Sequence, residues 1–466
     1  MGLQLYVLVH LLLRSFSNGV DRMYGTQLSL ALSLLAIAVA AVFFNQLFRH
    51  RFDRRIHGLL LASSLFAGVS LISLLVSDFV TDAMLDEYQA WYAFVRYVYL
   101  ISIIMLLTCV YQQPSFCLNV HRMCMVVLAV DASVGIAQYL AGNTILVTQY
   151  DKFARVIGLS SHPVTYSLEL VLLFCICELT RRKLQWAAHY FHVGLYALGF
   201  AALILSASRT GVGLLGATLA IYLLVRRPLL LPLFAVAGIL VLIASPFEQL
   251  FSELQSIPDY ITSGDYTVWD VRTAITSMHW RIHHWYYLSN KALELPWLGF
   301  GPGQEPLYSP FALLAHSQFV EVFFETGLLG LIAFGHFWLR IAGAAVSASP
   351  ESGPASIRNS HDADARTFWI AMFVGLTWVG LFDQSLNDET VSLSFLLLSV
   401  FVMLAPASAI AQVPLRRLIE AGPGRAPRSA EIRRGRRRGT QGISGEGTLL
   451  TSVGGMQLER TGGRSP

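Results

Sequence analysis

The sequence predicts an all-α fold, a polytopic membrane helix bundle of about 11–12 transmembrane helices with one long outer insert that contains an amphipathic helix. Of the 466 residues, 55% are hydrophobic and only 13% are charged, whereas about 25% charged residues are usual in soluble domains. Apolar runs of membrane-spanning length recur from Thr26 to Pro406. Because the backbone must satisfy its own hydrogen bonds in hydrocarbon, we expect these runs to be helices.

Basic side chains orient the predicted helices. Arg and Lys gather at every second connection, as expected for cytoplasmic loops. These clusters are Arg49 to Arg55, Arg181 to Lys183, Arg226 and Arg227, Arg340 to Arg366, and Arg416 to Arg438. The alternate connections are acidic or neutral: Asp78 to Glu87, Gly142 to Pro163, Pro246 to Ser317, and Asp383 to Glu389. The alternation predicts a single topology for the whole chain.

Eleven apolar runs have the length of a span. In chain order they are 27–47, 57–77, 91–111, 123–141, 164–179, 188–206, 210–225, 229–245, 318–343, 367–382 and 390–408. Before them, Leu3 to Leu13 is apolar but short, and Arg14 interrupts it. It lacks the basic start and cleavage site of a signal peptide. A marginal first span, an interfacial helix and translation from Met23 stay open as interpretations.

These runs divide the chain into five segments. They are 1–26, the marginal N-terminal segment; 27–245, transmembrane helices; 246–317, the outer insert; 318–408, transmembrane helices; and 409–466, a basic cytoplasmic tail. The tail is rich in Gly, Arg and Ser, which is typical of disorder. The five cysteines lie in or beside apolar runs without metal-ligand or disulfide spacing, so we interpret them as small core residues.

Ionisable residues inside spans are functional candidates because they are costly in hydrocarbon. They are Arg96, Asp131, Glu169, Glu321 and Glu325. Arg96, Glu169 and Glu321 lie within two turns of the outer ends of their helices, roughly 8 Å below the surface at ~1.5 Å per residue. Their shared depth favours a polar cavity that opens to the outside. The alternative is a structural ion pair, for example of Arg96 with Asp131 or Glu169.

Two outer connections carry further candidates. Ser208 is predicted to cap the helix that follows it, and Arg209 adds a planar guanidinium suited to phosphate oxygens. The alternative for Arg209 is an arginine that snorkels to the interface. The other connection carries Arg155 and, before Pro163, His162, which we interpret as a surface histidine.

The outer insert carries the most informative pattern. Ala274 to Leu295 has apolar and aromatic residues at helical spacing and is predicted to be an amphipathic helix at the membrane surface, with Arg281 on its polar side. The tight turn Gly299 to Gly303 follows; it is a weak phosphate-loop signal, because no helix follows it directly. His316 then begins the next span, where an imidazole suits a general base.

Three histidines of the insert, His279, His283 and His284, raise the alternative of a zinc site. No HExxH motif is present in the sequence, and the neighbouring carboxylates are scattered: Asp265, Asp270 and Glu294. We therefore predict no metal and no other cofactor, and we expect most of these histidines to be interfacial.

The order of these motifs resembles the O-antigen ligase and polymerase superfamily. The resemblance rests on Ser208-Arg209-Thr210-Gly211, Arg281 with Trp285, Pro296 to Gly303, His316 to Phe319, Glu325 to Gly330 and, less closely, Arg155 to Pro163. It covers residues 150–335 well and the rest by topology only. The chain departs from the family at Ser317, where Asn is frequent, and at His162-Pro163, where Pro-Asn is preferred. Both departures concern the sub-family more than membership.

The resemblance implies a metal-independent inverting glycosyltransferase of the bacterial inner membrane, with a periplasmic active site and an undecaprenyl-diphosphate-linked glycan donor. Arg281 and Arg209 would bind the diphosphate, and His316 would accept the proton of the acceptor. The predicted substrate-binding residues are Arg155, Arg96, Glu169, Glu321, Gly301 and Gly303. The expected partners are the lipid-linked donor, an acceptor glycan or lipid A-core, membrane lipids and other polysaccharide-assembly proteins, and no nucleic acid.

Within this class we favour a polymerase of O-antigen, capsule or exopolysaccharide, because the insert is moderate in size and no domain is appended. The alternative is an O-antigen ligase that transfers glycan to lipid A-core. From another class, the alternative is a transporter of a lipid-linked or anionic solute. A transporter is expected to show internal repeats and broken helices near the midplane, and the sequence shows neither.

The topology makes the first testable prediction. Reporter fusions at Ser263 in the insert and at Gly422 in the tail should report opposite sides of the membrane, because a change of side accompanies each span. The measurement is the ratio of alkaline phosphatase to β-galactosidase activity of each fusion. The same location for both fusions would contradict the topology.

Overall fold

The computed structural model describes residues 2–24, 27–49, 53–80, 87–113, 115–142, 155–160, 162–184, 190–244, 258, 262, 277–311, 315–347, 355–382 and 390–405. All of them belong to one compact unit, Met1–Gln412. They form helices and turns, with no β-strand among them. The tail 409–466, the reporter sites Ser263 and Gly422, and nearly all of the insert before Ser277 lie outside the described residues.

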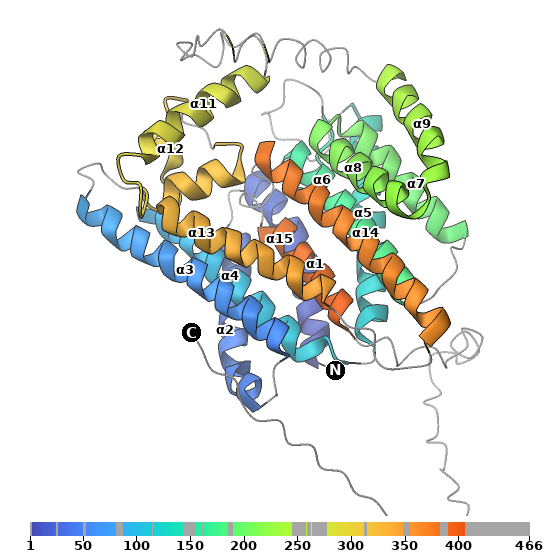
Figure 1. The fold of residues 1–466 in the computed structure, drawn as a ribbon, viewed down its shortest axis with the longest axis horizontal. Helices are drawn as coiled ribbons and strands as arrows, with labels where there is room; N and C mark the ends of the chain where they lie inside the picture. Colours follow the sequence, from blue (N-terminus) through green and yellow to red (C-terminus); the bar gives the residue numbers. More distant parts are fainter. Residues whose placement is uncertain are drawn as a thin grey trace, which may run out of the picture. The chain divides into compact units, whose positions relative to one another are not determined.

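The helices follow the order that hydropathy predicts (Figure 1). They are α1 (Gly2–Tyr24), α2 (Leu28–Arg49), α3 (Arg54–Val80), α4 (Glu87–Val110), α5 (Phe116–Leu140), α6 (Pro163–Lys183), α7 (Tyr190–Leu205), α8 (Arg209–Arg226), η1 (Pro228–Leu230), α9 (Leu231–Ala244), α11 (Ser277–Ala292), α12 (Glu305–Tyr308), α13 (Gln318–Val346), α14 (Ala355–Phe382) and α15 (Thr390–Leu404). Within the described residues, α3, α4, α5, α6, α8 and α13 are long and apolar enough to cross a membrane. The all-α, multi-pass fold is therefore confirmed, while the number of spans stays a prediction.

Two helices extend beyond their apolar runs. α14 begins at Ala355 rather than at 367, and its polar first part carries Asp364, which bonds to α6 and α8. α1 continues to Tyr24 and packs against α2, α4, α5 and α15. Arg14 on α1 is only 2% exposed and donates to Ser17. The N-terminal segment is therefore packed into the helix bundle, and its position in the membrane stays a prediction.

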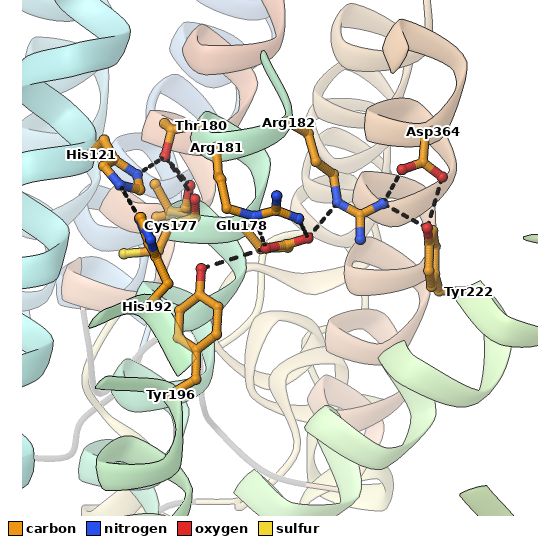
Figure 2. Close-up of polar contacts among 11 residues, drawn as sticks. His121, Cys177, Glu178, Thr180, Arg181, Arg182, His192, Tyr196, Tyr222 and Asp364 are labelled. Atoms are coloured by element: carbon orange, nitrogen blue, oxygen red, sulfur yellow. Dashed lines mark hydrogen bonds and ion pairs between the residues drawn. The ribbon is translucent and has the colours of Figure 1, made fainter. Parts of the chain in front are cut away.

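A polar network joins four helices at the end of α6 that contains Lys183 (Figure 2). Arg182 of α6 bonds to Glu178 at 2.7 Å, to Asp364 of α14, and to Tyr222 of α8 at 2.7 Å. Tyr222 in turn donates to Asp364 at 2.7 Å, and Tyr196 of α7 donates to Glu178 at 3.4 Å. Because each charge meets opposite charge or a hydroxyl, we interpret this network as a structural link between helices.

A histidine pair extends this network to α5. The Nδ1 atom of His121 lies 2.8 Å from Thr180 Oγ1, and its Nε2 atom lies 3.2 Å from Nε2 of His192 on α7. Lys183 donates to the carbonyl of Ala405, the residue after α15. The polar contacts at this end therefore reach α5, α6, α7, α8, α14 and the end of α15.

The insert joins α13 at a kink. Gly327 has φ +64° inside α13, so the helical hydrogen bonds are interrupted there. Leu328 N donates to Pro296 O at 2.8 Å, outside the helix, and Phe324 O accepts from Phe300 N at 2.9 Å. Leu329 N and Glu325 O likewise bond to Trp297 O and Gly301 N, so the turn of the insert takes the place of two helical hydrogen bonds.

A side chain of α3 also bonds to this junction between the insert and α13. The hydroxyl of Ser73 lies 2.5 Å from the carbonyl oxygen of Leu298 and 2.7 Å from that of Glu325. A Cβ atom on Gly327 would lie 2.5 Å from Leu298 N, well inside contact distance. The junction therefore needs glycine for two reasons, a positive φ and a close backbone approach.

The second testable prediction follows from this junction. Gly327→Ala should destabilise the protein by about 2 kcal/mol or more, because φ +64° with ψ −165° is a backbone region open essentially to glycine, which costs another residue about 1–3 kcal/mol, and the insert must also shift. The measurement is thermal unfolding of the purified protein in detergent. The matched control is Gly335→Ala on the same helix, where a Cβ atom meets nothing within 4 Å. Equal unfolding temperatures for both variants would contradict the role of Gly327.

Candidate functional site

His316 lies at the start of α13 in a backbone conformation that is rare for a non-glycine residue. Its φ is +50°, and Ser317 follows as the N-cap of α13. In the described part of the chain, Ala207 is the other non-glycine residue with positive φ, and it precedes Ser208 and Arg209. Such strain persists only where the surroundings hold it, and it is frequent at functional sites. His316 belongs to one of the motifs named above, and Ala207 directly precedes another, Ser208 to Gly211.

The indole of Trp280 on α11 connects two of the predicted catalytic residues. Its ring centre lies 5.1 Å from that of His316, in an edge-to-face arrangement at 85°. The guanidinium of Arg281 lies 5.9 Å from the same ring. In the sequence, Trp280 counts only as one of the aromatic residues at helical spacing between Ala274 and Leu295. The signal for its role was its place beside Arg281.

His284 contacts the same aromatic group. Its ring centre is 6.0 Å from that of Trp280 and 5.2 Å from that of Phe311. Its Nε2 atom lies 2.7 Å from Oγ of Ser309, whose oxygen also accepts from Phe311 N at 3.1 Å. The hydroxyl of Ser309 and Nε2 of His284 therefore share a hydrogen bond, and the tautomer of the imidazole decides which of the two donates.

Burial, and then the neighbouring His316, lower the pKa of His284 to about 3. His284 is therefore neutral at physiological pH. An unfolded histidine titrates near 6.5, so the folded protein binds fewer protons than the unfolded chain below that pH. The contribution of His284 makes the fold less stable as the pH falls from about 6.5 to about 3.

The expectation that most insert histidines are interfacial is wrong. His279, His283 and His284 are 4%, 2% and 0% exposed. They are buried because α11 packs against α13, with Leu288 and Ala292 in a small apolar cluster. No group of three or more His, Cys, Asp or Glu residues in the described ranges is arranged to hold a metal ion. Asp265 and Asp270 lie outside those ranges.

Arg96 on α4 faces α13. Its nearest carboxyls include those of Glu321 and Glu325, and its guanidinium lies 5.3 Å from the ring of Tyr92. The example of an ion pair with Asp131 or Glu169 is therefore not the arrangement described, because the acidic partners come from α13. Tyr97, next to Arg96, donates to Glu325 at 3.1 Å.

The turn glycines have partners inside the protein. Gly301 N donates to the carbonyl oxygen of Glu325 at 2.9 Å, and Gly303 N donates to its carboxylate at 2.6 Å. Both glycines have positive φ. Their amides are thus used to dock the turn on α13, and the prediction that Gly301 and Gly303 bind substrate gains no support from this geometry.

The loop that carries Arg155 is docked on α5. The amide of Gln138 donates to Gly158 O at 2.7 Å and accepts from Gly158 N at 2.9 Å. Asp131 accepts from Leu159 N at 2.9 Å, and its carboxyl interacts electrostatically with the buried Glu169 of α6. Asp131 thus holds the loop and lies beside Glu169.

Helix caps fix the starts of α6 and α8. Ser208 caps α8 by accepting from Gly211 N at 3.4 Å, and Ser167 of α6 donates to its hydroxyl at 2.7 Å. These bonds join the two helices beside Arg209, the first residue of α8. His162, predicted to be a surface histidine, is exposed and caps α6 by accepting from Val164 N.

Comparison with known families decides the class. Residues 194–335 match a family model described as O-antigen ligase. The chain carries an O-antigen ligase domain. The resemblance found in the motifs is confirmed, and the match supports a multi-pass membrane glycosyltransferase of the O-antigen ligase or polymerase type, which acts in polysaccharide assembly on a lipid-linked glycan and an acceptor. No curated protein matches the chain.

The O-antigen ligase domain contains Arg209, Arg281 and His316, whereas Arg96 and Glu169 precede it. The described contacts gather the predicted site residues in two groups. One group lies on α4, α11 and α13 and includes Arg96, Arg281, His316 and Glu321; the other lies around α5, α6 and α8 and includes Arg155, Glu169 and Arg209. α14 packs against both α13 and α8 and runs between them in Figure 1.

Proposed function

We propose that this protein is a metal-independent inverting glycosyltransferase. It takes a glycan from undecaprenyl diphosphate at the periplasmic face of the bacterial inner membrane. The proposal rests on one observation. The guanidinium of Arg281 and the imidazole of the strained His316 both contact the indole of Trp280, and all three residues lie in the O-antigen ligase domain. A guanidinium suits the departing diphosphate, and an imidazole suits the acceptor hydroxyl.

The chemistry is a single displacement. The acceptor oxygen forms a bond to the anomeric carbon of the donor as the bond from that carbon to the diphosphate oxygen breaks. His316 takes the hydroxyl proton, and the released diphosphate anion is stabilised by Arg281 and Arg209. Attack from the side opposite the leaving group inverts the anomeric carbon. No step requires a metal ion.

The acceptor decides between two members of the class. We propose a polymerase that joins repeat units of an O-antigen, capsule or exopolysaccharide, on the ground of the moderate insert between α9 and α13. The family description favours the alternative, a ligase that transfers the glycan to lipid A-core. Both members need the same donor and the same leaving group.

Surface glycans of a deletion strain test the function. A polymerase predicts the loss of long chains with single repeat units retained. A ligase predicts lipid-linked polymer that accumulates without attachment to the core. Unchanged glycans would contradict glycosyl transfer by this protein, and a transported solute would then have to be sought.

The third testable prediction concerns Arg281. Arg281→Ala should lower transfer about a hundredfold or more, the effect of losing about 3 kcal/mol of transition-state stabilisation in a desolvated site. Arg281→Lys should restore little, because a point charge does not replace a bidentate guanidinium. The measurement is transfer by purified protein, with the exposed Arg122→Ala on α5 as matched control. Near-normal transfer by stable Arg281→Ala protein would remove Arg281 from the mechanism.

The fourth testable prediction concerns His316. His316→Ala should be inactive, and wild-type activity should fall on acidification, because a protonated imidazole cannot accept a proton. Activity should survive EDTA. The measurements are pH–rate profiles with and without EDTA, with His336→Ala on the same helix as matched control. EDTA inactivation that a divalent ion reverses, together with an inactive His279→Gln, would favour a metal site instead.

A further inference from the structure

Ala315 is the residue before His316, and its backbone N–H and carbonyl groups both form hydrogen bonds with side chains. Ala315 N donates to a carboxylate oxygen of Glu305 at 3.0 Å. The carbonyl oxygen of Ala315 accepts from the indole nitrogen of Trp285 at 2.5 Å. Ala315 and Glu305 are both 0% exposed. Two peptide planes, one on each side of Ala315, are thus fixed by side chains from other parts of the insert.

The two side chains come from separate and rigid positions. Trp285 lies in the middle of α11, which packs against α13. Glu305 begins α12 and stands two residues after Gly303, whose amide is bonded to Glu325 on α13. The two side chains that bond to Ala315 therefore come from two segments that both contact the kinked helix α13.

These two hydrogen bonds account for the strained backbone of His316. The Ala315 carbonyl belongs to the peptide plane that includes His316 N, so the bond from Trp285 fixes the plane from which φ of His316 is measured. On the other side, Ser317 is the N-cap of α13, and its carbonyl accepts from Glu321 N at 3.0 Å. With both flanks fixed, His316 keeps φ at +50° instead of relaxing to an ordinary conformation.

We infer that Glu305 and Trp285 are positioning residues that hold His316 in the left-handed conformation, with its imidazole against Trp280. The catalytic consequence rests on the proposed function, whereas the positioning itself does not. A buried carboxylate is costly unless it is well hydrogen-bonded. Glu305 offsets part of that cost by accepting the Ala315 amide at the point where the backbone must turn.

Activity of single variants is the first arm of the test. Glu305→Ala and Trp285→Phe each remove one bond to Ala315, and each should lower kcat about ten- to a hundredfold with little change in KM, as expected for a displaced catalytic group. Glu305→Gln keeps an acceptor oxygen and should retain most activity. The matched controls are Glu294→Ala, an exposed carboxylate beside Lys291, and Trp297→Phe, an exposed indole; both should behave like wild type.

Hydrogen–deuterium exchange of the purified protein is the second arm and needs no substrate. The amides of residues 315–317 should exchange faster in Glu305→Ala and Trp285→Phe than in the controls. If Glu305→Ala does not yield folded protein, Trp285→Phe carries the test, because it removes the donor to Ala315 O, and Glu305→Gln, which keeps the acceptor oxygen, serves as its control.

The outcomes separate the two claims. Unchanged exchange at 315–317 in Trp285→Phe and Glu305→Ala would overturn the inference, whatever their activity. Faster exchange together with an active His316→Ala would support the positioning and contradict the proposed function. Faster exchange, lower kcat and an inactive His316→Ala are the expected result.

Discussion

The hydrogen bonds between the insert and the kink at Gly327 are the interaction on which the candidate site depends. A regular helix would use the carbonyls of Phe324 and Glu325 within itself. In α13 they accept instead from Phe300 and Gly301. From this anchor the chain runs to Glu305, which holds Ala315 and so sets the backbone of His316. The strain at His316 is thus stabilised by the hydrogen bonds to Ala315, whose partner Glu305 follows the turn that is docked at the kink.

Two polar regions of the protein differ in their contacts, and the difference indicates that one is structural and the other catalytic. Around Arg182, ion pairs and hydroxyl bonds link helices to one another, and Arg182 also lies 4.5 Å from the ring of Tyr222 (Figure 2). Around His316, the backbone is strained, a buried neutral histidine lies nearby, and a guanidinium shares an aromatic partner with the imidazole. The first arrangement stabilises the packing of helices. The second one stores local strain of the kind found at catalytic sites.

Hydropathy and helix caps were enough to predict the helices, because spans and caps are local properties of the sequence. Ser208 caps α8 as predicted, and the all-α membrane fold is confirmed. Tertiary partners were not predictable in this way. Arg96 meets glutamates more than 200 positions further along the chain, and the glycine turn binds a helix kink rather than offering its amides to phosphate. The two segments that dock are both visible in the sequence as glycine motifs, Gly299 to Gly303 and Glu325 to Gly330. The local sequence does not show that these two segments contact each other.

The central claim is that the outer start of α13, not the Arg182 end, meets the lipid diphosphate. A cryo-electron microscopy map of the protein with a non-hydrolysable undecaprenyl-diphosphate analogue tests it directly. The account predicts diphosphate density against the guanidinium of Arg281, beside Trp280, the ring that both Arg281 and His316 contact. Diphosphate density against Arg181 and Arg182, with His316 facing only protein, would contradict it.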